Sequence, residues 1–253
     1  MKAAIGEIME VCLLAGKIML QSGAEIYRIE DTMNRIARAC AVHESHSYVT
    51  PTGIFLSLQG EAWDHEQTKF VRIYERQIDL HKIVNVNEIS RKLCLGELTL
   101  AEAYKALLNI EKTAPLYPFW LQLIAAALAS GFFSLTFGGT SMDFLPAVIA
   151  GGLGFLLYTI SSRRIPVKFF AEILGAITIG FCAYFFYHLG IAIQIDKVII
   201  GSVMPLVPGV LITNAVRDLM AGDLVSGLAR GTESFLTAFA IGAGVAIVLA
   251  LLM

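Results

Sequence analysis

A short polar stretch in the last fifth of the chain carries the side chains best suited to binding a metabolite. Asn214, Arg217 and Asp218 are spaced at i, i+3 and i+4, so they share one face of a helix. A guanidinium offers a planar fork that matches a carboxylate, and Arg217 could therefore hold an anionic substrate. We predict a substrate-binding site formed by Asn214, Arg217, Asp218, Asp223, Arg230 and Glu233.

A purely structural role is the competing interpretation of the same charges. The acidic partners available to Arg217 for a structural ion pair are Asp218, Asp223 and Glu233. Arg230 carries the same ambiguity. The residue types alone leave both interpretations open.

The apolar run just before this stretch is interrupted. The segment IIGSVMPLVPGVLIT contains Pro205, Pro208 and Gly209. Proline lacks a backbone donor and clashes with the carbonyl one turn back, so we predict a helix break here. A broken membrane helix beside charged residues is typical of substrate sites in secondary transporters, because freed backbone groups at membrane depth need protein or water as partners. The alternative is a kinked helix that runs into a polar cytosolic loop.

Two other groups of charged residues are candidates for function. Glu172 is the one carboxylate inside a predicted membrane span; it could couple transport to protons, or it could be a helix N-terminal charge that the macrodipole favours. The second group contains paired carboxylates, which can do general acid–base work, although a solvated helix face or a docking surface is the commoner use. This cytosolic motif comprises Glu25, Tyr27, Arg28, Glu30 and Asp31.

Other chemistries find no support in the sequence. The histidines do not repeat with the spacing of zinc ligands, and the four cysteines lack a CxxC pair, so we expect free thiols and no metal site. There is no glycine-rich phosphate loop and no GxSxG motif, which argues against ATP-driven transport and serine hydrolysis. We therefore expect no cofactor, no enzymatic activity and no nucleic-acid partner.

The composition is that of a membrane protein. Of the 253 residues, 56% are hydrophobic and 16% are charged, whereas about a quarter of the residues in soluble domains are charged. Nearly all charges fall before Pro115 or in short loops. We predict a cytosolic α/β (α+β) domain over residues 1–114 and an all-α transmembrane bundle of about five helices over residues 115–253.

The domain predicted over residues 1–114 mixes helices and strands. Ser22 with Glu25 forms a capping box that predicts the start of a second helix, and Thr99 with Glu102 forms another. The link GEAWDHEQT between two β-like runs indicates a hairpin loop. In order, we predict a helix over Ile5–Gln21, a helix from about Ala24 to Ala41, β-like runs over Ser47–Leu58 and Lys69–Tyr74, and helices over Asn87–Leu95 and Thr99–Ile110.

Five apolar segments follow, each near the length needed to cross about 30 Å of hydrocarbon. Thirteen of the 19 Lys and Arg residues precede Pro115, and most of the others lie in loops on the same side. By the positive-inside rule we predict a cytosolic N-terminus and a periplasmic C-terminus in a bacterial inner membrane. The predicted spans are Pro118–Phe137, Phe144–Ile160, Phe169–Leu189, Val198–Thr213 and Phe235–Leu252.

Two long motifs resemble a known family. SGAEIYRIEDTMNRIA (Ser22–Ala37) and PLVPGVLITNAVRDLMAGDLVSGLARGTES (Pro205–Ser234) closely resemble the threonine/serine exporter (ThrE) family. The resemblance covers nearly the whole chain and implies a cytosolic N-terminal domain followed by membrane spans. Single-chain members have a longer membrane part, so this chain resembles the larger subunit of the family's split, two-subunit form.

The resemblance also implies a function. It implies export of a small carboxylate metabolite driven by the proton gradient: threonine or serine in single-chain members, and C4-dicarboxylates such as succinate in split members. The implied partners are a small, separately encoded membrane subunit of the same family (YjjB-like) and the lipid bilayer, and a homo-oligomer is a further alternative. A membrane-anchored cytosolic enzyme or metabolite sensor, and a passive channel, remain as other interpretations. An anchor needs only one or two spans and no broken, charged helix, which favours the transporter.

Overall fold

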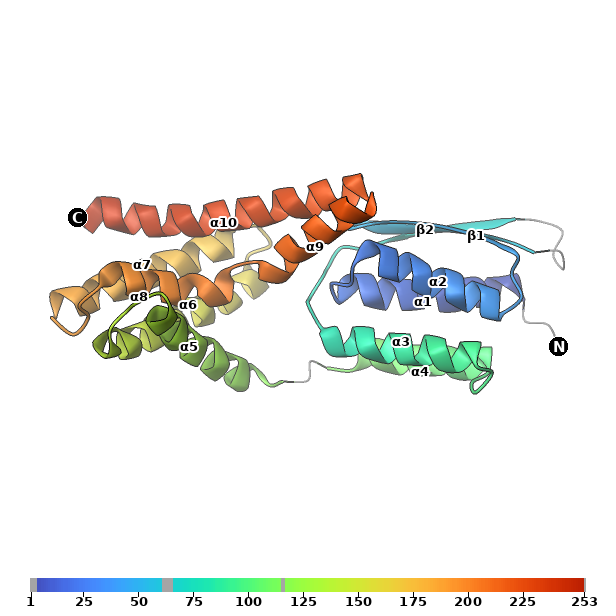
Figure 1. The fold of residues 1–253 in the computed structure, drawn as a ribbon, viewed down its shortest axis with the longest axis horizontal. Helices are drawn as coiled ribbons and strands as arrows, with labels where there is room; N and C mark the ends of the chain where they lie inside the picture. The colour runs from blue at the N-terminus through green and yellow to red at the C-terminus, as the bar shows by residue number, and fades with distance from the viewer. Residues whose placement is uncertain (1–3, 61–65, 115–116, 253) are drawn as a thin grey trace. The chain divides into compact units, whose positions relative to one another are not determined.

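The computed structural model describes residues 4–60, 66–114 and 117–252, and the chain is mostly helical (Figure 1). It divides into two compact units. The first is Met1–Pro115 with Val210–Gly231, and the second is Leu116–Gly209 with Thr232–Met253. The division predicted from the sequence, 1–114 and 115–253, differs in one respect: the structure joins Val210–Gly231, which holds most of the predicted site, to the first unit.

The first unit contains a layered fold of sheet and helices. Three antiparallel strands form a sheet in the order β1-β2-β3. The helices α1 and α2 cover one face of this sheet, and α3 and α4 pack on the far side of α1 and α2 (Figure 1). The elements are α1 (Ile5–Gln21), α2 (Ile26–Ala39), β1 (Glu44–Thr50), β2 (Gly53–Gln59), β3 (Gln67–Arg72), α3 (Leu80–Cys94) and α4 (Leu100–Lys112).

The helix α1 is the centre of the first unit's core. It contacts α2, α3, α4 and the strands β2 and β3, so most of its circumference is covered. Ile8, Cys12 and Met19 are no more than 1% exposed. The exposed Glu7 and Glu10 lie on the remaining surface. The predicted helix over Ile5–Gln21 has the same bounds as α1.

The prediction of one β-like run over Ser47–Leu58 is wrong in detail. The chain turns at Pro51 and returns, so that Thr50 pairs with Gly53 and the run belongs to two strands, β1 and β2. Proline fixes its own backbone and supplies no N–H to a sheet, which explains a turn in the middle of a β-favouring segment. The second run is β3, and residues 61–65 of the predicted hairpin loop lie outside the described residues.

The capping box predicted at Ser22 is also wrong. Ser22 ends α1, and Gly23 follows with a φ of +86°, a conformation that favours glycine. The helix α2 begins at Ile26 with Glu25 at its N-cap, and the Glu25 side chain makes no capping hydrogen bond. The second capping box is confirmed, because Thr99 Oγ1 accepts from the Glu102 N–H and a Glu102 oxygen accepts from the Thr99 N–H.

The helix α3 begins earlier than Asn87, where the sequence predicts it to start. Asp79 is its N-cap, and Asp79 Oδ1 accepts hydrogen bonds from the N–H groups of His81 and Lys82. Gly96, with a φ of +74°, separates α3 from α4. Lys17 of α1 forms an ion pair with Glu111 of α4 at 2.7 Å, which ties the two helix layers together at their surface.

The described residues from 117 to 252 form helices joined by short connections. Among the described residues, four helices are long and apolar enough to cross a membrane, or five spans result if the bent pair α8–α9 counts as one. The 3₁₀ turn Met204–Leu206 ends α8, and α9 begins at Gly209, directly after Pro208. The elements are α5 (Phe119–Thr136), α6 (Ser141–Arg164), α7 (Phe170–His188), α8 (Ile195–Val203), η1 (Met204–Leu206), α9 (Gly209–Ala221) and α10 (Leu224–Leu252).

Close helix packing holds the second unit together. A Cβ on Gly151 of α6 would lie 2.0 Å from the Ser130 hydroxyl of α5, and one on Gly201 of α8 would lie 2.5 Å from the Ser134 nitrogen. Small residues of this kind let membrane helices approach closely. Asp143 is fully buried and fastens the start of α6, because its oxygens accept N–H bonds from Thr140 and from the α7–α8 loop.

The helix α10 is longer than one membrane crossing requires. It has 29 residues, which at a rise of 1.5 Å per residue gives about 43 Å, against about 30 Å of hydrocarbon. Its first eight residues, Leu224–Gly231, belong to the first unit, and the rest belong to the second. One continuous helix therefore carries the end of the predicted site into the last apolar segment.

Candidate functional site

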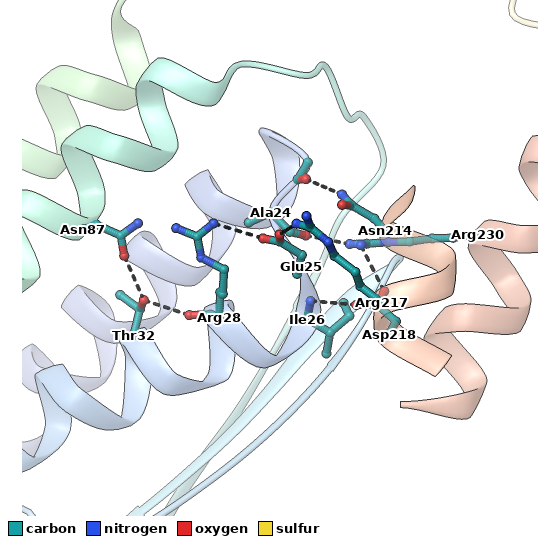
Figure 2. A network of polar contacts seen from close by, with 11 residues as sticks. Ala24, Glu25, Ile26, Arg28, Thr32, Asn87, Asn214, Arg217, Asp218 and Arg230 are labelled. Carbon is teal, nitrogen blue, oxygen red and sulfur yellow. Dashed lines mark hydrogen bonds and ion pairs between the residues drawn. The ribbon is translucent and has the colours of Figure 1, made fainter. Parts of the chain in front are cut away.

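Most of the predicted site residues lie in the first unit, close to the motif that contains Glu25 and was predicted to be cytosolic. The turn between α1 and α2, Gly23–Ile26, lies against α9 and the first turns of α10 (Figure 2). These are the two segments of sequence that carried the family resemblance. They are about 190 to 206 positions apart in the chain, and they form one polar network.

Three side chains of α9 and α10 hold the backbone of this turn. Asn214 Nδ2 donates to the Gly23 carbonyl at 2.8 Å, and Arg230 Nη2 donates to the Ala24 carbonyl at 2.8 Å. Asp218 Oδ1 accepts from the Ile26 N–H at 3.1 Å. We call Asn214, Asp218 and Arg230 the backbone clamp. Buried backbone groups need such partners, and Asp218 here supplies the α2 cap that Ser22 was predicted to give.

The charged pair within the backbone clamp is sealed from solvent. Arg230 Nη1 lies 3.0 Å from Asp218 Oδ2, and the two side chains are 3% and 0% exposed. Taking two charges out of water is costly, so such a pair persists only where further hydrogen bonds satisfy it. Each partner also bonds the backbone of the Gly23–Ile26 turn. These two residues are placed to support the structure.

A second ionic group lies beside the clamp and is open to solvent. Glu25 Oε1 accepts from Arg217 Nη1 at 2.5 Å, and Glu25 Oε2 accepts from Arg28 Nη1 at 3.2 Å (Figure 2). The Glu25 side chain is 8% exposed, whereas Arg28 and Arg217 are 43% and 56% exposed. We call Arg28, Glu25 and Arg217 the arginine–glutamate triad. It carries two positive charges and one negative charge.

The environment of Glu25 favours its ionised form. Burial acts to raise the pKa of Glu25, but the hydrogen bond from its own backbone N–H, the bond from Arg217 and the nearby Arg28 together lower the pKa below its usual value. The Glu25 carboxylate is therefore charged at neutral pH and attracts the guanidinium groups of both Arg28 and Arg217.

The partner of Arg217 is not among those that the sequence predicts. The candidate structural partners were Asp218, Asp223 and Glu233, whereas Arg217 pairs with Glu25, 192 positions away. Asp218 pairs with Arg230 instead, because the turn of α9 points the aspartate toward the buried side. Charge type and local spacing identified the charged residues, but they could not show which residues form ion pairs with each other in the folded chain.

The remaining predicted site residues lie outside the triad. The Asp223 N–H donates to the Asp218 carbonyl at 2.9 Å, at the α9–α10 turn. Glu233 belongs to the second unit, where it lies 3.4 Å from Lys168. Glu172 lies half-buried in the first turn of α7, also in the second unit. Pro205, Pro208 and Gly209 mark the break between α8 and α9.

Two further members of the predicted cytosolic motif, Glu30 and Asp31, make side-chain contacts from α2. Glu30 Oε1 accepts from the Val49 N–H of β1 at 2.9 Å, and Ser226 of α10 donates to the Val49 carbonyl at 3.2 Å. Burial, and then the nearby charge of Asp223, raise the pKa of Glu30, although the Val49 bond opposes them. Asp31 pairs with Arg35 on the exposed side of α2. The sequence does not predict this contact of Ser226, because a lone serine gives no signal of a distant backbone partner.

A cavity elsewhere in the first unit is less suited to an anionic metabolite. It measures about 610 Å³ and lies between the start of α1 and β3. Glu7, Glu10 and Glu66 contribute to its lining, with Lys69 as the basic residue. Carboxylates of this number would repel an anion. Within the described part of the chain, no cluster of His, Cys, Asp and Glu forms a group that could hold a metal ion.

Comparisons with known proteins point to one family. A family model described as "Putative threonine/serine exporter" matches residues 10–252. The "Probable succinate transporter subunit YjjP" of Escherichia coli is 24% identical over 253 residues, covering 96% of this chain and 93% of that protein. The "Probable threonine/serine exporter" of Mycobacterium tuberculosis is 23% identical over 236 residues, covering 92% of this chain but 44% of that protein. No solved structure matches the chain.

Proposed function

The chain belongs to the threonine/serine exporter family, and on that premise we propose that it is the larger subunit of a secondary transporter that exports a small carboxylate metabolite. The substrate is a threonine- or serine-type amino acid or a C4-dicarboxylate such as succinate, and the proton gradient drives its export. The printed names of two relatives support this substrate class. The relative that matches this chain nearly end to end is named as a subunit, which supports a second component.

The membrane arrangement is part of the same proposal. We place the chain in a bacterial inner membrane with its N-terminus in the cytosol and its C-terminus in the periplasm, as the distribution of Lys and Arg favours. The partner is a small, YjjB-like membrane subunit. The four or five apolar helices support a transporter over a membrane-anchored enzyme or sensor, because an anchor needs fewer.

The observation that carries the proposal is the placement of Arg217. It lies on α9, which begins directly after the break at Pro208, and its guanidinium is 56% exposed beside a carboxylate. A half-exposed arginine next to an interrupted apolar helix is chemically suited to bind and release a carboxylate. The backbone clamp fixes α9 to the Gly23–Ile26 turn, so it positions Arg217 without itself meeting the substrate.

The other predicted residues have supporting roles in this proposal. Glu172 is the candidate for proton coupling, because it is a carboxylate at the start of an apolar helix. Asp223 directly precedes α10 and Glu233 lies within it, so both extend the charged stretch. Neither contacts the substrate directly in this proposal.

Efflux measurements test this function. Cells that lack the chain, the small subunit or both should accumulate succinate or threonine and release it more slowly, and restoring both genes should restore release. Restoring this chain alone should not. A protonophore should abolish the restored efflux if the proton gradient drives it. Unchanged efflux in the double deletion, with turnover of a metabolite by the purified chain instead, would support the anchored-enzyme alternative.

A further inference from the structure

The Glu25 carboxylate binds Arg217 in the way that a substrate carboxylate would. One guanidinium nitrogen of Arg217 is bonded to Glu25 Oε1. A guanidinium has five N–H donors, and no second side-chain partner of Arg217 is seen among residues 4–60, 66–114 and 117–252. Arg28 reaches the other oxygen of the same carboxylate from the first turn of α2. A carboxylate metabolite that approached Arg217 would find its guanidinium already paired with the Glu25 carboxylate.

We propose that Arg28 and Arg217 form an anion site in which Glu25 is a built-in competitor, displaced from Arg217 when a small carboxylate binds. The identification of the ligand as a carboxylate metabolite rests on the proposed function. The site itself rests on the charges and exposure of the triad. Two half-exposed guanidiniums around one carboxylate leave a net positive charge that can accept a second anion.

The fold can release Glu25 without losing its support. The Glu25 side chain caps no N–H group of α2, and its backbone bond is to its own N–H, which does not involve Arg217. The backbone clamp holds Gly23, Ala24 and Ile26 through Asn214, Arg230 and Asp218. When Glu25 leaves Arg217, its other oxygen keeps the bond to Arg28. The exchange therefore replaces one carboxylate by another at Arg217 while α9 stays in place.

A tethered competitor gives the site a moderate affinity. Because Glu25 is part of the chain, its carboxylate is present at a high effective concentration beside Arg217. Incoming carboxylates must compete with it, which weakens their apparent binding. A transporter gains from this, since a substrate that binds too tightly is released slowly.

Binding measurements on the full chain, purified with its small subunit, test the inference. Succinate and threonine are titrated calorimetrically into wild-type protein and the Glu25→Gln variant. Glutamine keeps the size of the side chain and loses the charge, so we expect roughly tenfold tighter binding of the probe that binds. Arg217→Ala should abolish binding. Glu111→Gln, which breaks the Lys17 ion pair elsewhere in the first unit, is the matched control and should bind as wild type does.

Chemical labelling of the wild-type protein provides a second readout that needs no variant. Phenylglyoxal modifies accessible arginines, and mass spectrometry locates the adducts. Succinate or threonine should slow modification of Arg217 and Arg28, while modification of the exposed Arg91 of α3 should stay unchanged. Lack of protection at Arg217 by both probes, or unchanged affinity in folded Glu25→Gln, would overturn the inference.

The two proposals fail in different ways. Protection of Arg217 without any carboxylate efflux would remove the transport function and leave the anion site. Efflux of a carboxylate that leaves Arg217 equally reactive would keep the transport function and remove the site.

Discussion

The backbone clamp and the arginine–glutamate triad are built from the same residue types in opposite surroundings. In the clamp, the side chains of Asp218 and Arg230 are 0% and 3% exposed and bond the backbone of the Gly23–Ile26 turn. In the triad, Arg217 is 56% exposed and donates to the Glu25 side chain. A buried pair cannot exchange its partner without leaving a charge unpaired, whereas an exposed pair can. Within one network, the buried pair is therefore suited to holding the structure, and the exposed pair is suited to exchanging its partner for a ligand.

The largest effect is expected from breaking the clamp. Arg230→Ala would leave Asp218 charged and buried without its counter-ion, which should lower the free energy of unfolding by about 3–5 kcal/mol. Thermal unfolding of the purified protein, followed by circular dichroism, measures this loss. Arg35→Ala is the matched control, because the Arg35–Asp31 pair is exposed and should contribute no more than about 1 kcal/mol. A variant Arg230→Ala as stable as Arg35→Ala would show that the buried pair is dispensable.

Substitution in the arginine–glutamate triad should have a small effect on stability and a large effect on export. Arg217→Ala should leave stability within about 1 kcal/mol of wild type, because the ion pair is half-exposed. Export should fall roughly tenfold to a hundredfold, since a charged hydrogen bond to the substrate is lost. Arg217→Lys keeps the charge without the planar fork, so partial export is expected. The measurement is efflux at matched membrane abundance.

A double variant separates this result from a structural ion pair. If Arg217 served only to neutralise Glu25, then Arg217→Ala combined with Glu25→Gln would restore export. We expect no restoration, because the substrate would still lack its guanidinium. Arg91→Ala is the control for removing an exposed arginine from the same unit.

The sequence indicated the parts of this network but not their pairing. Spacing at i, i+3 and i+4 correctly placed Asn214, Arg217 and Asp218 on one helix, α9. It could not show that α9 turns Asp218 inward and Arg217 outward, since both lie on the same polar stripe. The link from Arg217 to Glu25 spans 192 positions and exists only because the fold brings α9 to the Gly23–Ile26 turn.

The capping residues predicted from local sequence are wrong at α2, where a tertiary contact satisfies the start of the helix instead. Thr99 and Glu102 cap α4 as predicted, because each accepts the backbone N–H of the other within the same turn. Ser22 and Glu25 match the same pattern but do not form it: Ser22 ends α1, and the Glu25 carboxylate is engaged by two arginines. The missing cap comes from Asp218. Asp143 also serves a tertiary contact, because it is fully buried and accepts the Ile193 N–H of the α7–α8 loop.

A smaller effect is expected from the neutral member of the clamp. Asn214→Ala removes the bond to the Gly23 carbonyl, and one neutral hydrogen bond contributes about 1 kcal/mol to stability. The same unfolding measurement applies. Asn109→Ala on the exposed face of α4 is the matched control and should stay within about 0.5 kcal/mol of wild type. Equal stability of the two variants would mean that Asp218 and Arg230 alone hold the turn.

The smallest effect expected is a difference in pH dependence between two glutamates of the motif. The pKa of Glu25 is lowered in the folded protein, so its contribution to stability is complete above the unfolded value, about 4.3, and is lost as the pH falls through the folded pKa. The pKa of Glu30 is raised, chiefly by burial. The folded state then binds more protons than the unfolded state between the two pKa values of Glu30, and stability falls as the pH rises through that window.

The two charge-removing variants should therefore change the stability profile in opposite directions. Glu25→Gln should lower the melting temperature at pH 7 and leave it close to wild type at acid pH, where Glu25 is protonated. Glu30→Gln retains an oxygen for the Val49 N–H but never ionises, so it should raise the melting temperature at pH 7 relative to wild type and match it at acid pH. Melting temperatures recorded from well below pH 4 up to pH 8, a range that includes the lowered pKa of Glu25, decide between these outcomes. Parallel profiles for the two variants would show that the arginines of the triad do not distinguish Glu25 from an ordinary buried carboxylate.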